Sequence, residues 1–98
     1  MSLTRESRPR LARKARLRWD RKASRHVLLY PERGLVLNET AAQIVLLCDG
    51  ARSLAQIAGE LAARYQRDPG GLEAELLFYL GSLEQRGLLE LSPVEGGP

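Results

Sequence analysis

Only two side chains in this sequence, one histidine and one cysteine, belong to the types that most often bind metals or act as nucleophiles. His26 has no second histidine at ligand spacing, so a metal site built on it would lack partners. Cys48 ends a very apolar stretch beside Asp49, whereas a reactive thiolate needs a positive and accessible setting. Glu73 and Glu75 are two residues apart on an expected helix, so their carboxylates do not face each other. We therefore expect no catalytic site, no metal site and no cofactor, and the sequence predicts that the protein is not an enzyme.

The composition is that of one small globular domain. The 98 residues are 44% hydrophobic and 28% charged, and a single cysteine excludes an internal disulfide. The first residues lack the apolar core of a signal peptide, and no apolar stretch approaches the roughly 20 residues of a membrane span. We therefore expect a cytoplasmic protein without a membrane partner.

The charges are distributed unevenly along the chain. Residues 1–33 hold eleven Lys and Arg against three acids, a net charge of +8, while residues 34–98 hold four against nine, a net charge of −5. A basic front half favours an acidic partner or nucleic acid. It is equally consistent with a solvated face and a flexible basic arm.

Three short strands are expected to position the functional residues. Residues 15–19 alternate apolar and basic side chains, residues 26–30 are more apolar, and residues 35–37 are wholly apolar. Polar turns at 20–24 and 31–34 have the length of hairpin connections. The sequence therefore predicts a three-stranded antiparallel meander in which residues 35–37 form an edge.

Three helices are expected after the sheet. Asn38 is a suitable N-cap for the first, Ser53 and Gln56 form a capping box for the second, and Asp68 caps the third. The first helix is apolar on nearly every side, which places it in the core. The predicted fold is α+β and winged-helix-like, with the sheet followed by a three-helix bundle. Residues 1–8 are expected to be a disordered arm and residues 92–98 a disordered tail.

A winged-helix DNA-binding regulator is therefore one functional hypothesis. A recognition helix needs basic surroundings that contact phosphates. The third helix, residues 69–86, carries three glutamates against Arg86, a net charge of −2. Because this sign is unfavourable, we expect no nucleic-acid partner and keep DNA binding only as the alternative.

Peptide capture at the edge strand is the other hypothesis. Residues 34–37 carry no charge or proline that would blunt the edge, so their free N–H and C=O groups can accept an extended peptide. The arm, residues 88–91 or a second copy of the chain could instead cover the edge. An open edge also favours a homodimer.

A resemblance to a known family is carried by three segments: LLYPERGLVLNETA, then LNETAAQIVLLCDGARSLAQIAGELAARY (residues 37–65), and finally LGSLEQRGLLEL. Over residues 9–91 the chain resembles the coenzyme PQQ synthesis protein D (PqqD) family. The most specific matches are Pro31-Glu32, Leu37-Asn38 with Ala41, Asp49-Gly50, and at the C-terminal end Leu83 with Arg86-Gly87-Leu88-Leu89.

The resemblance implies a peptide chaperone in pyrroloquinoline quinone biosynthesis, built as a RiPP recognition element. Such a protein binds the ribosomally made precursor peptide and presents it to a radical-SAM enzyme, so both are implied partners. In such elements the peptide adds as a strand to the third strand and lies against the third helix. Carried onto this chain, the resemblance implies these peptide-binding residues: Leu35, Val36, Leu37, Leu76, Tyr79, Leu80 and Leu83.

Overall fold

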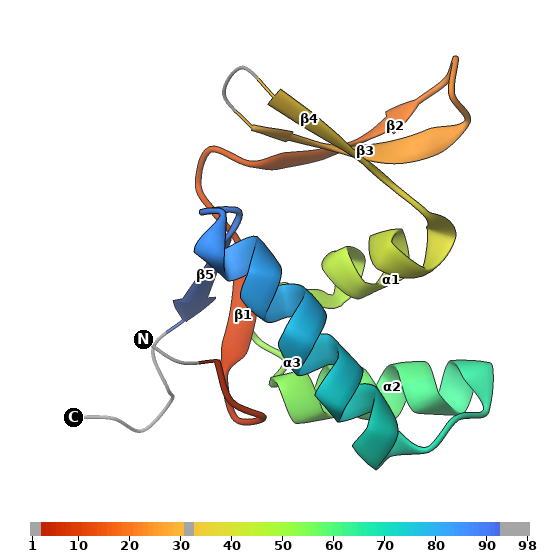
Figure 1. Cartoon of the computed structure of the whole chain (residues 1–98), viewed down its shortest axis with the longest axis vertical. Helices are drawn as coiled ribbons and strands as arrows, with labels where there is room; N and C mark the ends of the chain where they lie inside the picture. Colours follow the sequence, from red (N-terminus) through yellow and green to blue (C-terminus); the bar gives the residue numbers. More distant parts are fainter. Residues whose placement is uncertain (1–2, 31–32, 93–98) are drawn as a thin grey trace.

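The computed structural model describes residues 3–30 and 33–92, and Figure 1 shows how they are arranged. These residues form two antiparallel sheets and three helices. In chain order the elements are β1 (Arg8–Leu11), β2 (Arg16–Asp20), β3 (Arg25–Tyr30), β4 (Arg33–Leu37), α1 (Glu39–Leu47), α2 (Leu54–Tyr65), α3 (Pro69–Gln85) and β5 (Leu89–Ser92). The α+β architecture predicted from the sequence, with a three-stranded antiparallel sheet followed by three helices, is confirmed.

The three-stranded sheet has the order β2-β3-β4, so β4 is an edge as predicted. Leu28 of β3 pairs with Leu17 of β2 and Leu35 of β4, and these three leucines share the face turned toward the helices. Leu28 is 0% exposed, whereas Val36 on the opposite face is 55% exposed. The alternation of buried and exposed residues along the strands therefore fixes the register.

Local caps determine where the helices begin. The Asn38 side chain accepts a hydrogen bond from the Ala41 amide at 2.7 Å, and the Asp68 side chain accepts one from the Gly71 amide at 2.9 Å. Ser53 heads the predicted capping box of α2. All three predicted caps are thus present, and each satisfies an amide that a helix start leaves without a partner.

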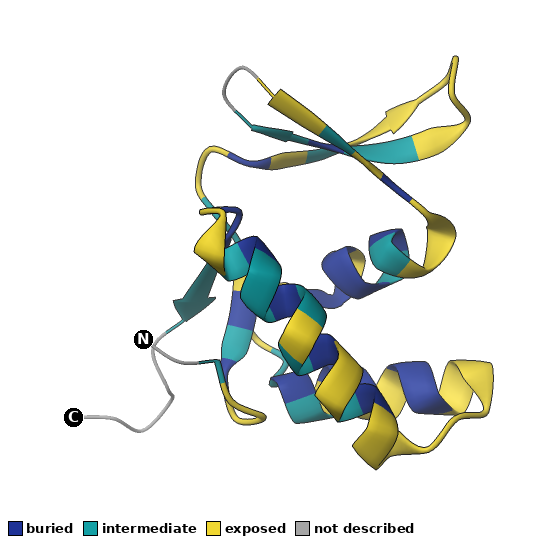
Figure 2. Ribbon diagram, in the orientation of Figure 1, coloured by how far each residue is buried: buried dark blue, intermediate teal, exposed yellow. Residues whose placement is uncertain are grey.

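The core lies where α1 meets the sheet and the other two helices. Figure 2 shows that α1 is buried along most of its length, while β2 is largely exposed. The largest side chains with less than 2% exposure come from β1, β3, α2, α3 and the residue before β5: Pro9, Leu28, Leu54, Ile57, Leu61, Leu76, Leu80, Leu83 and Leu88. No helix within the described residues is both long enough and apolar enough to cross a membrane.

The two ends of the domain form a second sheet that the sequence did not predict. β1 pairs with β5, with Arg8 opposite Ser92 and Leu11 opposite Leu89. Residues 3–8 of the expected arm lead into β1, which begins at Arg8, and residues 1–2 lie outside the described residues. The Ser7 carbonyl accepts a hydrogen bond from the Leu54 amide at 2.8 Å, so this segment supplies a partner for a backbone amide in the first turn of α2. The expected tail begins inside β5 at Ser92, and residues 93–98 lie outside the described residues.

Candidate functional site

The free edge of β4 is the first component of the candidate site. Among the described residues β4 pairs with β3 alone. Tyr30 and Arg33 pair across a two-residue connection, so they are the hydrogen-bonded pair that closes this hairpin. Bonded and non-bonded pairs alternate along an antiparallel ladder, so Leu35 bonds inward to β3. Gly34 and Val36 therefore direct their N–H and C=O groups toward the free edge.

Two segments considered as covers for this edge are engaged elsewhere. The N-terminal arm leads into β1, and β1 (residues 8–11) pairs with β5 (residues 89–92), which contains most of the second segment. The amide of Ala12 also donates to the carbonyl of Leu88 at 2.9 Å, which closes this second sheet against the end of α3. Neither of these two described segments therefore covers the β4 edge.

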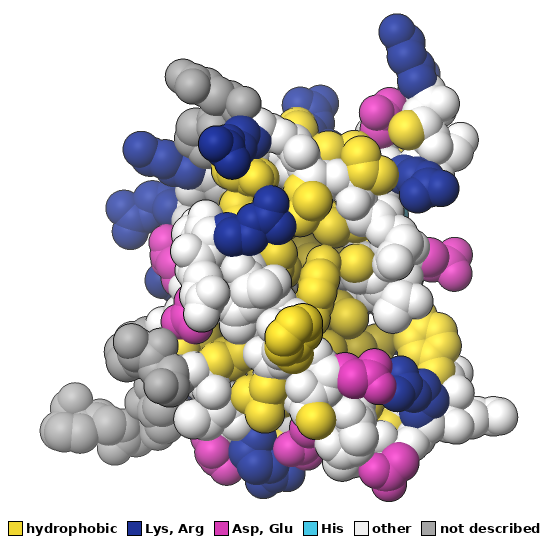
Figure 3. All heavy atoms as spheres, in the orientation of Figure 1, with side chains coloured by type: hydrophobic (Ala, Val, Ile, Leu, Met, Phe, Trp, Pro, Cys, Tyr) yellow, Lys and Arg dark blue, Asp and Glu magenta, His cyan; other side chains and the backbone are white. Residues whose placement is uncertain are grey.

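One face of α3 forms the wall opposite this edge. Between them lies a groove of about 220 Å³, which we call the β4–α3 groove. Its lining consists of Leu35, Val36, Leu37, Asn38, Ala41, Tyr79, Ser82, Leu83 and Arg86. Figure 3 shows hydrophobic atoms gathered in the hollow between the sheet and the helices, with Lys and Arg side chains around the sheet.

The structure brings five of the seven predicted peptide-binding residues together in this groove: Leu35, Val36, Leu37, Tyr79 and Leu83. Leu76 is 1% exposed and lines a neighbouring hollow, whereas Leu80 is 0% exposed and belongs to the hydrophobic core. The four groove residues that sequence reasoning missed are Asn38, Ala41, Ser82 and Arg86. Ser82 and Arg86 lie three and seven residues after Tyr79, so helical spacing could have found them.

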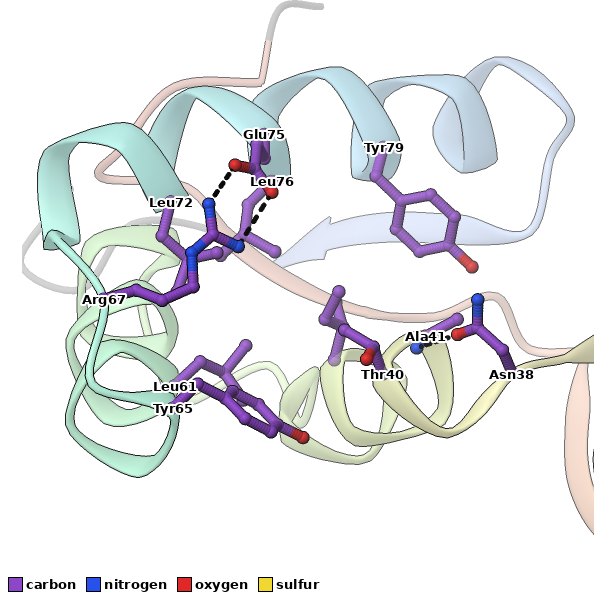
Figure 4. A pocket seen from close by; sticks show the side chains of 11 residues that line it. Asn38, Thr40, Ala41, Leu61, Tyr65, Arg67, Leu72, Glu75, Leu76 and Tyr79 are labelled. Atoms are coloured by element: carbon purple, nitrogen blue, oxygen red, sulfur yellow. Dashed lines mark hydrogen bonds and ion pairs between the residues drawn. The ribbon is translucent and has the colours of Figure 1, made fainter.

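A second hollow, the three-helix pocket, opens beside the groove and is drawn in Figure 4. Its volume is about 400 Å³, and its lining comes from α1, α2, α3 and the residues that flank them: Asn38, Thr40, Ala41, Ile44, Leu61, Tyr65, Arg67, Leu72, Glu75, Leu76 and Tyr79. Arg67 and Glu75 form an ion pair at this pocket, with Nη1 donating to Oε1 at 3.1 Å. That guanidinium also lowers the pKa of the Glu75 carboxyl through its hydrogen bonds.

Tyr79 separates the two hollows. Its ring extends from α3 toward α1, and its hydroxyl is directed toward Asn38 at the start of α1 (Figure 4). Burial raises the pKa of the Tyr79 phenol, and the nearby thiol of Cys48 adds to this effect. The hydroxyl therefore remains neutral at physiological pH and is able to donate a hydrogen bond to a ligand carbonyl.

Cys48 and His26, the two side chains of the types that most often do chemistry, each have a neighbour among the described residues. The Cys48 thiol donates to the Ile44 carbonyl at 3.3 Å, and burial raises its pKa to about 12. His26 packs edge-on against Trp19, with their ring centroids 5.1 Å apart. Within residues 3–30 and 33–92, no three His, Cys, Asp or Glu residues lie close enough to hold a metal ion. An edge strand beside an apolar helical wall is suited to binding an extended peptide.

Comparison with known proteins assigns the family. The model of the family described as coenzyme PQQ synthesis protein D (PqqD) matches residues 25–89, from β3 to the start of β5. The chain belongs to the PqqD family. This confirms the resemblance drawn from the sequence.

Relatives of similar length carry names that state what they bind. The PqqA binding protein of Xanthomonas oryzae pv. oryzae strain PXO99A is 43% identical over 90 residues, covering 92% of this chain and 98% of the relative. The PqqA binding protein of Rhodopseudomonas palustris strain HaA2 is 42% identical, covering 91% of this chain and 87% of the relative.

Two solved structures share the fold. The solution structure of the PqqD truncation of Methylobacterium extorquens PqqCD is described as a functional, stand-alone RiPP recognition element. It is 39% identical to this chain with a TM-score of 0.78, covering 91% of this chain and 95% of that one. The crystal structure of PqqD from Xanthomonas campestris is 38% identical with a TM-score of 0.58, covering 92% and 100%.

Proposed function

We propose that this chain is a peptide chaperone of pyrroloquinoline quinone biosynthesis that binds the ribosomal precursor peptide PqqA by strand addition. The peptide extends the β2-β3-β4 sheet at β4 and packs its inward side chains against α3. The observation that carries this proposal is the open β4 edge facing an apolar wall, in a chain whose relatives are named PqqA binding proteins.

Main-chain hydrogen bonds supply affinity in this mode. Gly34 and Val36 each offer one donor and one acceptor to the added strand. The groove selects side chains through the apolar surfaces of Leu35, Tyr79 and Leu83. Such recognition tolerates variation in the peptide at positions that face solvent, because only alternate residues point into the groove.

Presentation to a radical-SAM enzyme is the second part of the proposal. An added strand keeps one of its own edges and one face exposed, so a second protein can contact the peptide while it is held. Fusion within the family supports an association with pathway enzymes. The bifunctional coenzyme PQQ synthesis protein C/D of Methylorubrum extorquens is 43% identical over 82 residues, which cover 22% of that protein.

A homodimer would compete with the peptide for the same β4 edge. A symmetric pair of β4 strands would occupy the donors of Gly34 and Val36. We therefore propose that the peptide-bound form is a monomer, and that any dimer formed through β4 dissociates when the peptide binds.

The geometry gives little support to a winged-helix DNA-binding regulator. The helix α3 contains Glu73, Glu75 and Glu84 and has no Lys or Arg between Pro69 and Gln85. Residual attraction from the basic front half would be electrostatic, so binding to a DNA duplex should weaken steeply as salt is raised and should ignore base sequence. Salt-resistant, sequence-selective retention of a duplex in a gel shift would favour the regulator instead.

An amide-resolved titration tests the proposed function. Isotopically labelled protein is titrated with a synthetic PqqA peptide, and backbone amide shifts are followed by NMR. We expect the largest shifts at Gly34 to Leu37 and along α3 from Tyr79 to Arg86. Shifts confined to the β1–β5 sheet, or the absence of any shift at saturating peptide, would contradict the proposal.

A further inference from the structure

The three-helix pocket and the β4–α3 groove lie next to each other along α3, on either side of Tyr79. The groove follows the C-terminal half of this helix, from Tyr79 to Arg86, and the pocket follows its N-terminal half, from Leu72 to Tyr79. Asn38, Ala41 and Tyr79 line both hollows. A peptide that occupies the groove and continues past Leu37 therefore arrives at the pocket.

The pocket has an apolar floor. Ile44, Leu61, Leu72 and Leu76 are between 1% and 8% exposed and form its deepest part. Its volume of about 400 Å³ lies within the range of sites that bind small apolar ligands. An apolar group that enters it leaves water for a hydrocarbon environment, which is favourable in proportion to the area covered.

Among the described residues that line the pocket, the two charged side chains, Arg67 and Glu75, balance each other. Arg67 and Glu75 pair with each other there, Thr40 contributes a neutral hydroxyl, and the Tyr65 side chain lies across from them (Figure 4). A charged ligand group would gain no partner in this arrangement and would lose its hydration. The mouth therefore favours an uncharged, apolar side chain over an acidic or basic one.

We propose that the three-helix pocket is a second subsite for the bound peptide, which receives an apolar side chain outside the segment that pairs with β4. This inference rests on the proposed function, because its occupant is the same peptide. Every strand pair within residues 3–30 and 33–92 is antiparallel, and antiparallel pairing is the more stable arrangement per residue. A peptide antiparallel to β4 enters beside Leu37, so the anchoring side chain lies N-terminal to the paired segment.

The dimensions of α3 set the position of the anchor. From Tyr79 back to Leu72 the helix rises about 10 Å, at about 1.5 Å per residue. An extended peptide covers this distance in about three residues, at roughly 3.3 Å each. The anchoring side chain is therefore expected about three residues before the segment that pairs with β4.

Two variants alter the pocket and leave the groove lining unchanged. Thr40→Trp places a large side chain in the pocket, and Tyr65→Ala removes one of its walls. Phe78→Ala is the matched control, because Phe78 is an aromatic residue of α3 that is 83% exposed and lines neither hollow. Affinity for a synthetic PqqA peptide is measured for the parent and each variant by calorimetry, and folding is checked by thermal melting.

We expect both pocket variants to bind full-length PqqA about tenfold more weakly than the parent, the loss typical of a significant interface side chain. Phe78→Ala should bind as the parent does. PqqA peptides shortened stepwise from the N-terminus should lose affinity at one step, and beyond that step the parent and the pocket variants should bind equally. Equal binding is expected because, once the anchoring side chain has been deleted from the peptide, a change in the pocket that it contacted has nothing further to remove.

Other outcomes overturn the inference and leave the proposed function separately testable. If folded Thr40→Trp and Tyr65→Ala bind PqqA like the parent, while substitutions at the β4 edge abolish binding, the pocket is empty and strand addition stands. If the pocket variants instead change the sedimentation of the protein without peptide, the occupant is a second copy of the chain. If the parent does not bind PqqA at all, the proposed function itself fails.

Discussion

Replacement of Val36 by proline tests the edge-strand mechanism by removing a single backbone N–H donor. The register of the hairpin directs the Val36 amide toward the free edge of β4, where an added strand would accept its hydrogen. Proline removes this donor and keeps the carbonyl, and an edge strand is the position in a sheet where proline is tolerated. Val36→Pro is therefore expected to fold and to bind PqqA poorly.

The size of the effect follows from the number of bonds at the edge. Gly34 and Val36 together offer two donors and two acceptors, so up to four main-chain bonds of about 0.5–1.5 kcal/mol each hold the peptide. Val36→Pro deletes one of these bonds and leaves a peptide carbonyl without a partner beside an apolar wall. The combined loss is about 1–3 kcal/mol, which raises the Kd roughly 5- to 150-fold.

Two further variants make the assay specific. Val36→Ala trims the same exposed side chain and retains the amide, so it should bind PqqA nearly as well as the parent. Leu35→Pro removes a donor that bonds inward to β3, so it should lower the melting temperature more than Val36→Pro does. Calorimetric affinity and thermal stability are measured for all three variants. Equal PqqA affinity of folded Val36→Pro and Val36→Ala would refute strand addition at β4.

Three more outcomes are expected from the described contacts. Leu80→Ala should lower the free energy of unfolding by about 2–5 kcal/mol in urea titrations while the folded fraction binds PqqA normally, because Leu80 is 0% exposed in the core. Cys48 should react with iodoacetamide slowly at pH 8 and rapidly in urea, because burial raises its thiol pKa to about 12 in the folded protein. The Arg5 guanidinium lowers the pKa of Glu73, so this pair stabilises the fold above the ordinary glutamate pKa, and its contribution is lost as the pH falls through the lowered value. Glu73→Gln should therefore lose less thermal stability than the parent between pH 7 and pH 3.

The elements that depend on local signals could be predicted from the sequence. Asn38, Ser53 and Asp68 each cap a helix through a residue three positions away, so the information lies within one turn. The strands β2 to β4 follow hairpin connections, which make neighbours in sequence neighbours in the sheet. These signals do not depend on distant parts of the chain.

The β1–β5 sheet could not be predicted in this way. It joins residues from opposite ends of the domain, and each strand has only four residues. Pro9 also lies within β1, where a missing amide argues against a strand. The pairing is stabilised by tertiary contacts, because the segment before it also satisfies the first amides of α2.

The helical periodicity of α3 predicted a buried stripe but could not divide that stripe between core and site. Leu80 and Leu83 are both almost fully buried, yet only Leu83 lines the groove. The division depends on how far β4 stands from α3, which is a property of the tertiary structure. Arg86 was missed because selection by apolar character excludes a basic residue at the end of the groove.

The short strand β4 and the apolar helix α1 are joined directly through Asn38. Asn38 ends the strand, caps the helix with its side chain and lines both hollows, so a single residue fixes their relative positions. Ala42 and Val45 of α1, each 2% exposed, anchor the helix in the core. In this peptide-free structure the β4 edge is formed, with its strand paired to β3 and continued by the buried helix α1. In the proposed strand addition, the ordering cost of binding would therefore fall mainly on the peptide.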